Sequence, residues 1–321
     1  MYVMENNEDF EIKQEIENIN NAFSQANSKE QKTSIFKKWW FWVIISVLAT
    51  ALIVGVTGNS DDNSNSGGSQ SGGSNTQGIS WKTSGTYKVG VDIDAGEYFI
   101  KCTSYNCYVQ VSSDSTGSFN SIIANDNIST HAYITVRDGE YLTITGGKFV
   151  LSSKVGAIEP SSDGTYGEGM YKAGKDISAG EYFIKCTSYN CYVQVSSDSV
   201  GTLNSIIAND NISTHTYITV REGEYLTVNG GNFVLSSKVG AVEPSSDGTY
   251  EEGMYKVGKD IPAGEYKIVA INSCYIEVSD SSNHTLHSII SNDNIDVGTS
   301  TYITVSNGQY LKVIGGKIYT Q

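Results

Sequence analysis

Two cysteine pairs are the residues whose spacing most clearly points to chemistry. Cys102 and Cys107 are separated by four residues, and Cys186 and Cys191 repeat that spacing. In an oxidising compartment such pairs form disulfides, and closing so short a loop stabilises a small domain by roughly 2 kcal/mol. A zinc site would need closer spacing and a second pair nearby. We therefore predict one disulfide within each pair, with free thiols as the alternative. Cys274 has no partner in this scheme.

Acidic and amide side chains form a second recurring pattern. The triplet Asn-Asp-Asn occurs at 125–127, 209–211 and 292–294. Such residues bond to nearby backbone groups, so we expect a turn after a strand at each triplet. The same oxygen-bearing side chains can also bind calcium, the only cofactor that the sequence suggests. The carboxylates available for calcium are those of Asp114, Asp126, Asp198, Asp210 and Asp293.

Tyrosines are the third group of candidate binding residues. The chain has 21 of them, many in segments of alternating polar and apolar residues. Tyrosine rings on a solvent-facing sheet can stack on sugar rings, although strand propensity and half-buried packing also account for them. The candidate ligand contacts are Tyr108, Tyr133, Tyr192, Tyr217, Tyr275 and Tyr302.

Composition and motifs argue against two broad functions. The formal net charge is −14, with 21 basic and 35 acidic residues, which disfavours nucleic acid as a partner. His131 and His215 occupy equivalent places, but the matching stretch 296–301 has no histidine. The sequence contains no Ser-His-Asp set, paired-carboxylate motif or phosphate loop. We therefore do not expect an enzyme.

One segment has the properties of a membrane anchor. Residues 39–57 carry no charge, and at 1.5 Å per residue they span roughly 28 Å, the thickness of a bilayer core. Lys37 and Lys38 precede the segment, so the positive-inside rule places 1–38 in the cytoplasm. A cleaved signal peptide and a buried core helix are the alternatives. We expect a single-pass protein of the cell membrane whose C-terminal repeats are extracellular.

The segments on either side of the anchor differ in character. Apolar residues within 10–23 follow helical spacing and predict a short cytoplasmic helix capable of weak self-association. Residues 58–80 are rich in Gly, Ser and Asn and predict a flexible linker with a root-mean-square reach of about 25 Å.

The rest of the chain consists of three copies of one unit. The segment beginning at Tyr87 returns at Tyr171 and Tyr255, each time 84 residues later, and the first two copies differ at 14 of 84 positions. A period this long indicates tandem domains on a string, with PSSDG segments as hinges. The predicted repeats are 81–160, 165–244 and 249–321.

Each copy has the pattern of an antiparallel β-domain. Alternating residues and glycine-containing turns predict a hairpin with a three-residue loop at Arg137-Asp138-Gly139, closed by a left-handed glycine. The expected fold class is an all-β ectodomain of three small antiparallel β-sandwich or jelly-roll-like modules, plus one transmembrane helix and the short cytoplasmic helix. Strands are expected near 86–91, 96–102, 107–113, 119–124, 132–137 and 140–151.

The motifs YKVGKDIPAGEY, IIANDN and YITV followed by GQYL resemble a repeat of uncharacterised surface and membrane-anchored proteins of Gram-positive bacteria. The resemblance implies surface location and tandem β-domains, but no activity or ligand. Together with the anchor, it predicts a surface protein whose modules bind a cell-wall glycan or a host surface weakly and multivalently. A structural spacer or a sensing ectodomain is the alternative.

Overall fold

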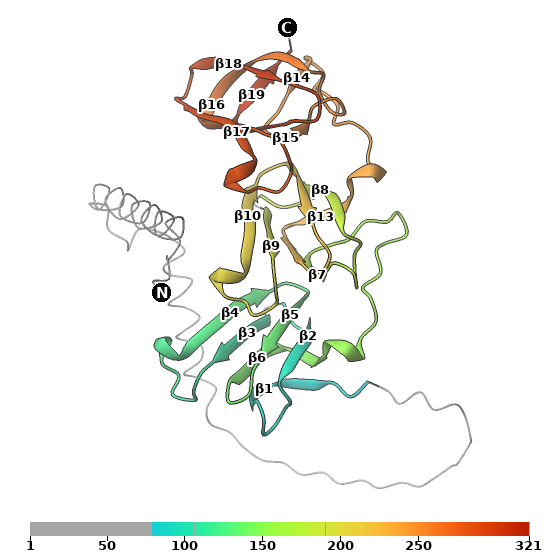
Figure 1. The fold of residues 1–321 in the computed structure, drawn as a ribbon, viewed down its shortest axis with the longest axis vertical. Helices are drawn as coiled ribbons and strands as arrows, with labels where there is room; N and C mark the ends of the chain where they lie inside the picture. Colours follow the sequence, from blue (N-terminus) through green and yellow to red (C-terminus); the bar gives the residue numbers. More distant parts are fainter. Residues whose placement is uncertain (1–78, 106, 190, 321) are drawn as a thin grey trace, which may run out of the picture. The chain divides into compact units, whose positions relative to one another are not determined.

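The computed structural model describes residues 79–320 except 106 and 190 (Figure 1). The predicted cytoplasmic helix, the anchor at 39–57 and nearly all of the linker lie outside the described residues. Within the described part of the chain, the helical segments are single 3-10 turns, and nothing helical has the length and apolar character of a membrane span. The described residues form an all-β structure of several sheets, as predicted.

The first module contains six strands, as predicted, although the first and fourth are shifted by several residues. They are β1 (Lys82–Lys88), β2 (Gly96–Cys102), β3 (Cys107–Ser112), β4 (Ile122–Ile128), β5 (His131–Val136) and β6 (Tyr141–Leu151). The first half of β6 pairs with β3 and its second half with β2, while β1 pairs along both halves. The strand bends at Gly146, whose φ of 71° is accessible to glycine at no steric cost. One strand therefore contributes to both layers of a small sandwich.

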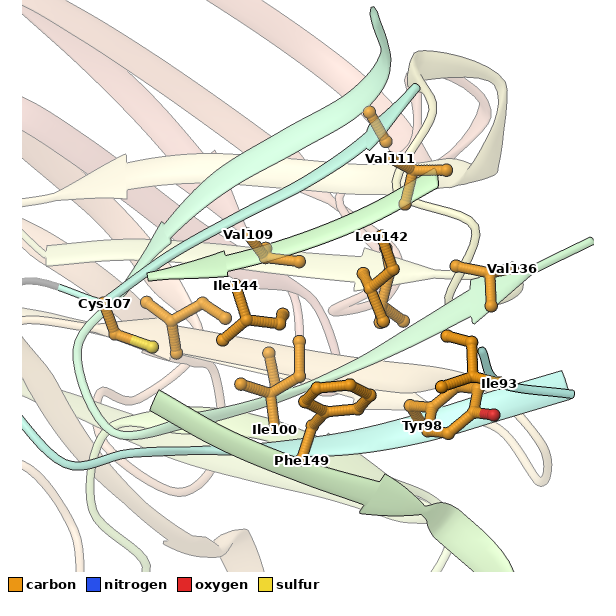
Figure 2. Close-up of a cluster of buried hydrophobic side chains, with 14 of the residues drawn as sticks. Ile93, Tyr98, Ile100, Cys107, Val109, Val111, Val136, Leu142, Ile144 and Phe149 are labelled. Atoms are coloured by element: carbon orange, nitrogen blue, oxygen red, sulfur yellow. The ribbon is translucent and has the colours of Figure 1, made fainter. Parts of the chain in front are cut away.

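Side chains of the two layers interdigitate to form the core. Figure 2 shows Val109, Leu142 and Ile144 from one layer facing Ile100 and Phe149 from the other. All five are at most 3% exposed. The alternation along each strand places these apolar residues inward and their polar neighbours outward.

The second and third modules repeat this arrangement around cores of their own. The second contains β7 (Gly169–Lys172), β8 (Gly180–Cys186), β9 (Cys191–Ser196), β10 (Ile206–Ile212), β11 (His215–Val220), β12 (Tyr225–Asn229) and β13 (Gly231–Leu235). The third contains β14 (Thr249–Tyr250), β15 (Gly253–Lys256), β16 (Gly264–Ser279), β17 (Ile289–Ile295), β18 (Ser300–Val305) and β19 (Tyr310–Tyr319).

The predicted turn between β5 and β6 is present, but the predicted hairpin is wrong. Gly139 is left-handed, with φ 88°, and the backbone N–H of Glu140 donates to the carbonyl of Arg137. However, β5 pairs with β2, and β6 pairs with β1, β2 and β3. Ile134 and Leu142 both face the core, as predicted, but they do so from opposite layers. The turn carries the chain from one layer to the other.

The predicted turns at the Asn-Asp-Asn triplets are also wrong. Residues 125–127 lie inside β4, where Asn125 pairs with Gln110 and Asp126 with Val109. The triplets of the other modules lie inside β10 and β17. Ladder hydrogen bonds to the neighbouring strand satisfy the backbone, which outweighs the local preference of Asn and Asp for turns.

Candidate functional site

Neighbouring modules contact each other through buried side chains at two junctions. The hydroxyl of Tyr133 in the first module donates to the carboxylate of Asp176 in the second, at 2.8 Å. Asp176 is 5% exposed and also accepts from the backbone N–H groups of Lys172 and Ile158. Desolvation, reinforced by the bond to Asp176, raises the pKa of Tyr133. A buried carboxylate is stable here because several donors surround it.

Glu97 is the centre of a second polar cluster at the same junction. Its carboxylate accepts hydrogen bonds from Ser199 and Tyr225 and forms an ion pair with Lys172 at 3.2 Å, all three from the second module. Desolvation by itself would raise the pKa of Glu97. Hydrogen bonds from Tyr225, Ser152 and Lys172 outweigh it and hold the pKa below its usual value.

A histidine completes the junction. His131 lies 4.8 Å from the ring of Tyr171, edge to face, and 5.7 Å from the ring of Phe99. Its Nε2 atom is buried without a hydrogen-bond partner in the described structure. Desolvation lowers the pKa of His131 to about 4, so the ring is neutral at physiological pH.

The second junction repeats these contacts. Tyr217 donates to Asp260, Glu181 binds Lys256, Ser282 and Tyr310, and His215 packs on Tyr255. This corrects the expectation of domains hinged on a string, because side chains of neighbouring modules are buried against each other. The arrangement is that of a repeat array with one interface used twice.

The glycine at the first junction, Gly169, has a packing role that can be tested. A Cβ atom on Gly169 would lie 2.2 Å from the imidazole of His131, whereas one on Gly85, the matching residue of the first module, would meet only the ring of Tyr87, at 3.3 Å. Both glycines have positive φ, 139° and 154°. We expect Gly169→Ala to lower the free energy of unfolding by about 2 kcal/mol more than Gly85→Ala, as measured by chemical denaturation. Equal effects would show that the strained backbone matters and the histidine contact does not.

Each module carries a repeated cluster of a tyrosine with amide or carboxylate side chains, here called the tyrosine face. In the first module, the hydroxyl of Tyr108 donates to Gln110 at 2.8 Å and accepts from Asn125 at 3.3 Å. The tyrosine ring is half-buried and the asparagine is exposed. The corresponding clusters are Tyr192, Gln194 and Asn209 in the second module, and Tyr275, Glu277 and Asn292 in the third.

The six candidate tyrosines therefore separate into three groups. Tyr108, Tyr192 and Tyr275 lie on the tyrosine faces. Tyr133 and Tyr217 are 2% and 0% exposed in the junctions, so their rings do not lie on a solvent-facing sheet. Tyr302 occupies the same place in the third module but is 56% exposed.

The candidate calcium carboxylates are spread over different environments. Asp114 and Asp198 accept hydrogen bonds within their own loops, from Thr116 and from Ser205 respectively. In the part of the chain that the structure describes, no group of three or more metal-binding side chains converges. Asp210 is engaged in ion pairs, and Asp293 accepts from the backbone N–H of Asn294. Calcium binding stays a prediction.

The cysteines of each pair lie next to each other. Cys102 and Cys107 are thiols whose side chains interact, and Cys186 and Cys191 repeat the arrangement. Desolvation raises the pKa of Cys102, which keeps the thiol in its protonated, less reactive form. Cys274 is fully buried. The pairs are placed for oxidation, and the disulfides stay predictions.

Mass spectrometry of the unreduced ectodomain tests this chemistry directly. We expect one bridge in each of the first two modules and a free thiol at Cys274. Reduction should then lower the melting temperature of these two modules only, since closing a short loop contributes roughly 2 kcal/mol. Two alkylatable thiols in the first module before reduction would contradict the prediction.

The comparisons with known proteins point to the outside of the cell. No curated protein matches the chain. The repeat motif itself and the Gram-positive source stay predictions. Residues 79–145 match the family model of the Rv1352-like extracellular domain, which supports an extracellular position for the β-modules.

Proposed function

We propose that the chain is a single-pass surface protein whose three-module ectodomain binds a ligand on a cell-wall or host surface through its tyrosine faces. The observation that carries the proposal is the recurrence of the same half-buried tyrosine, hydrogen-bonded to amide or carboxylate side chains, in all three modules. Aromatic rings flanked by fixed hydrogen-bonding groups are suited to hydroxyl-rich ligands such as glycans. The proposal assigns no catalytic role to the chain.

The junctions add a feature that a flexible string would lack. Buried contacts at both junctions hold neighbouring modules in one arrangement, so successive tyrosine faces have a fixed spacing. Binding at one module then brings the next one to its site with little further loss of freedom. Millimolar binding at each face is sufficient for adhesion by the whole array.

Adhesion measurements test the proposal. Cells displaying the full-length chain are compared with cells displaying the triple variant Tyr108→Ala, Tyr192→Ala, Tyr275→Ala on arrays of cell-wall glycans and matrix proteins. We expect tenfold or greater loss of adhesion with an unchanged β-type circular dichroism spectrum. Gln110→Ala alone, which leaves every ring in place and removes one hydrogen-bond partner of Tyr108, should reduce adhesion much less than the triple variant. Undiminished adhesion by the triple variant would overturn the proposal.

The proposed topology has its own test. Protease added to intact cells should remove an epitope tag placed after residue 320 and spare a tag placed before residue 30. Protection of the C-terminal tag would contradict an extracellular ectodomain.

A spacer is the second candidate function, because the two buried junctions also make a stiff connection. Replacing all three modules by unrelated domains of equal length separates the two functions. A spacer keeps its function after this replacement, and a binding array loses it.

A further inference from the structure

A groove of about 390 Å³ lies at the junction of the first and second modules. The first module contributes Val109 and Asp126, and the second contributes Tyr192, Gln194 and Thr227. Its volume is within the range of small-molecule sites. Most of its polar lining comes from strand faces, which hold side chains more rigidly than loops do.

Asp126 is the charged group that stands out in this groove. In β4 it alternates with Ala124 and Ile128, both buried, so its side chain is on the inward face of the sheet, at the end that the second module covers. The carboxylate is reached by solvent, yet desolvation raises its pKa. Among the described residues, no cationic side chain lies within ion-pair distance of it.

The second junction shows what this position accommodates. Asp210 takes the place of Asp126, and the ammonium of Lys312 lies 2.6 Å from its carboxylate. The imidazole of His284 lies 3.5 Å from the same oxygen and 2.6 Å from the carbonyl of Tyr217. Both side chains come from the third module and are largely buried. The third module thus places the ammonium of Lys312 and the imidazole of His284 next to the carboxylate of Asp210.

The first junction lacks both groups through two sequence differences. Gly201 aligns with His284, and Thr227 aligns with Lys312. The backbone at this position is left-handed in both loops: Gly201 has φ 78°, and His284 has φ 53°, the one positive value at a non-glycine residue in the described chain. Thr227 pairs across the strands with Gln194 as Lys312 pairs with Glu277. The two junctions therefore share one backbone arrangement. In the second junction a lysine of the chain lies next to the aspartate, and in the first junction an open groove lies there.

We propose that the groove of the first junction binds the ammonium group of a small organic amine, with Asp126 as its charge partner. Lys312 on Asp210 is the internal counterpart of that complex. A charge-assisted hydrogen bond in a partly desolvated groove is stronger than one between neutral groups. The hydroxyl of Tyr192 and the amide of Gln194, already hydrogen-bonded to each other at 2.6 Å, present a fixed polar wall to the rest of the ligand. The groove shares Tyr192 and Gln194 with the tyrosine face of the second module, but its charge partner, Asp126, belongs to no tyrosine face.

Calorimetric titration of the full-length chain in detergent micelles tests the proposal. The probes are pentylamine, with its ammonium on an alkyl chain, and glucosamine, with its ammonium on a sugar, each beside its N-acetylated form. We expect at least one amine to bind with a Kd of about 1 mM and its acetylated form to bind at least tenfold more weakly. The amine that binds identifies the alkyl or sugar source. No binding by either amine, or equal binding of the acetylated forms, would overturn the proposal.

Three variants locate the site. Asp126→Asn should weaken amine binding tenfold or more, whereas Asp293→Asn, at the same place in the third module, should leave it unchanged. Thr227→Lys places an ammonium group of the chain itself next to Asp126, as Lys312 does for Asp210. It should therefore abolish amine binding and raise the melting temperature of the chain. The rise in melting temperature shows that this variant is folded. Amine binding that survives both Asp126→Asn and Thr227→Lys would overturn the proposal.

Discussion

Replacing Tyr217 by alanine is expected to lower the free energy of unfolding by about 3–5 kcal/mol, whereas the same change at Tyr302 should alter it by less than about 0.5 kcal/mol. The two residues stand at the same place in identical Tyr-Ile-Thr-Val segments. Tyr217 is 0% exposed, and its hydroxyl donates to Asp260 at 2.8 Å. Its removal leaves a cavity and takes one donor from a buried carboxylate. Tyr302 is 56% exposed, so its removal does neither.

Guanidinium denaturation of the two variants, followed by tyrosine fluorescence and circular dichroism, measures the difference. Tyr217→Phe separates the contributions, because it keeps the ring and removes only the hydrogen bond, and we expect a loss of about 1–3 kcal/mol. If Tyr217→Ala and Tyr302→Ala behaved alike, the second junction would not be formed in solution.

Residue patterns predicted the interior of a module well. Strand alternation and the glycine turn at Arg137-Asp138-Gly139 are local properties, and the structure has both. Strand pairing was harder to predict. Several alternating segments can form ladder hydrogen bonds with one another, and the turn alone does not determine which strands pair. That is why the hairpin between β5 and β6 was expected, whereas each strand pairs elsewhere.

The junctions could not be deduced in the same way. Their residues, such as Glu97, Asp176 and His131, are polar or titratable, and hydrophobic patterning does not mark polar residues as buried. The first two copies are too alike for their agreement to indicate constraint. The usable signal was in the third copy, where Lys267 stands at the place of Phe99 and Ser300 at that of His131. In the third module, no further module packs against this surface in the described structure, and polar residues stand there in place of the apolar or aromatic junction residues.

The junction histidines lead to the second large effect, a loss of stability in mild acid. Desolvation lowers the pKa of both His131 and His215 to about 4, against an unfolded value near 6.5. The nearby carboxylates of Asp176 and Asp260 only partly offset the desolvation. Between these two pH values the unfolded chain binds more protons than the folded one, so stability falls as the pH falls.

The expected loss is about 3 kcal/mol for each histidine by pH 4, most of it between pH 6.5 and 4. This loss of stability occurs at higher pH than the loss due to Glu97 and Glu181. Their lowered pKa values shift their protonation in the folded chain to more acidic solution. The variant carrying His131→Leu and His215→Leu places apolar groups where the Nε2 atoms are buried without partners, so it should lose this part of the pH dependence.

Denaturation of the wild type and of this double variant at a series of pH values from 7 to 4 measures the effect. His287→Leu is the matched control, because His287 is exposed and its removal should leave the pH profile of the wild type unchanged. The difference between the double variant and the wild type should widen steadily as the pH falls below 6.5. Parallel profiles for the two proteins would mean that the histidines gain protons without opening the junctions, and that their desolvation does not couple to folding.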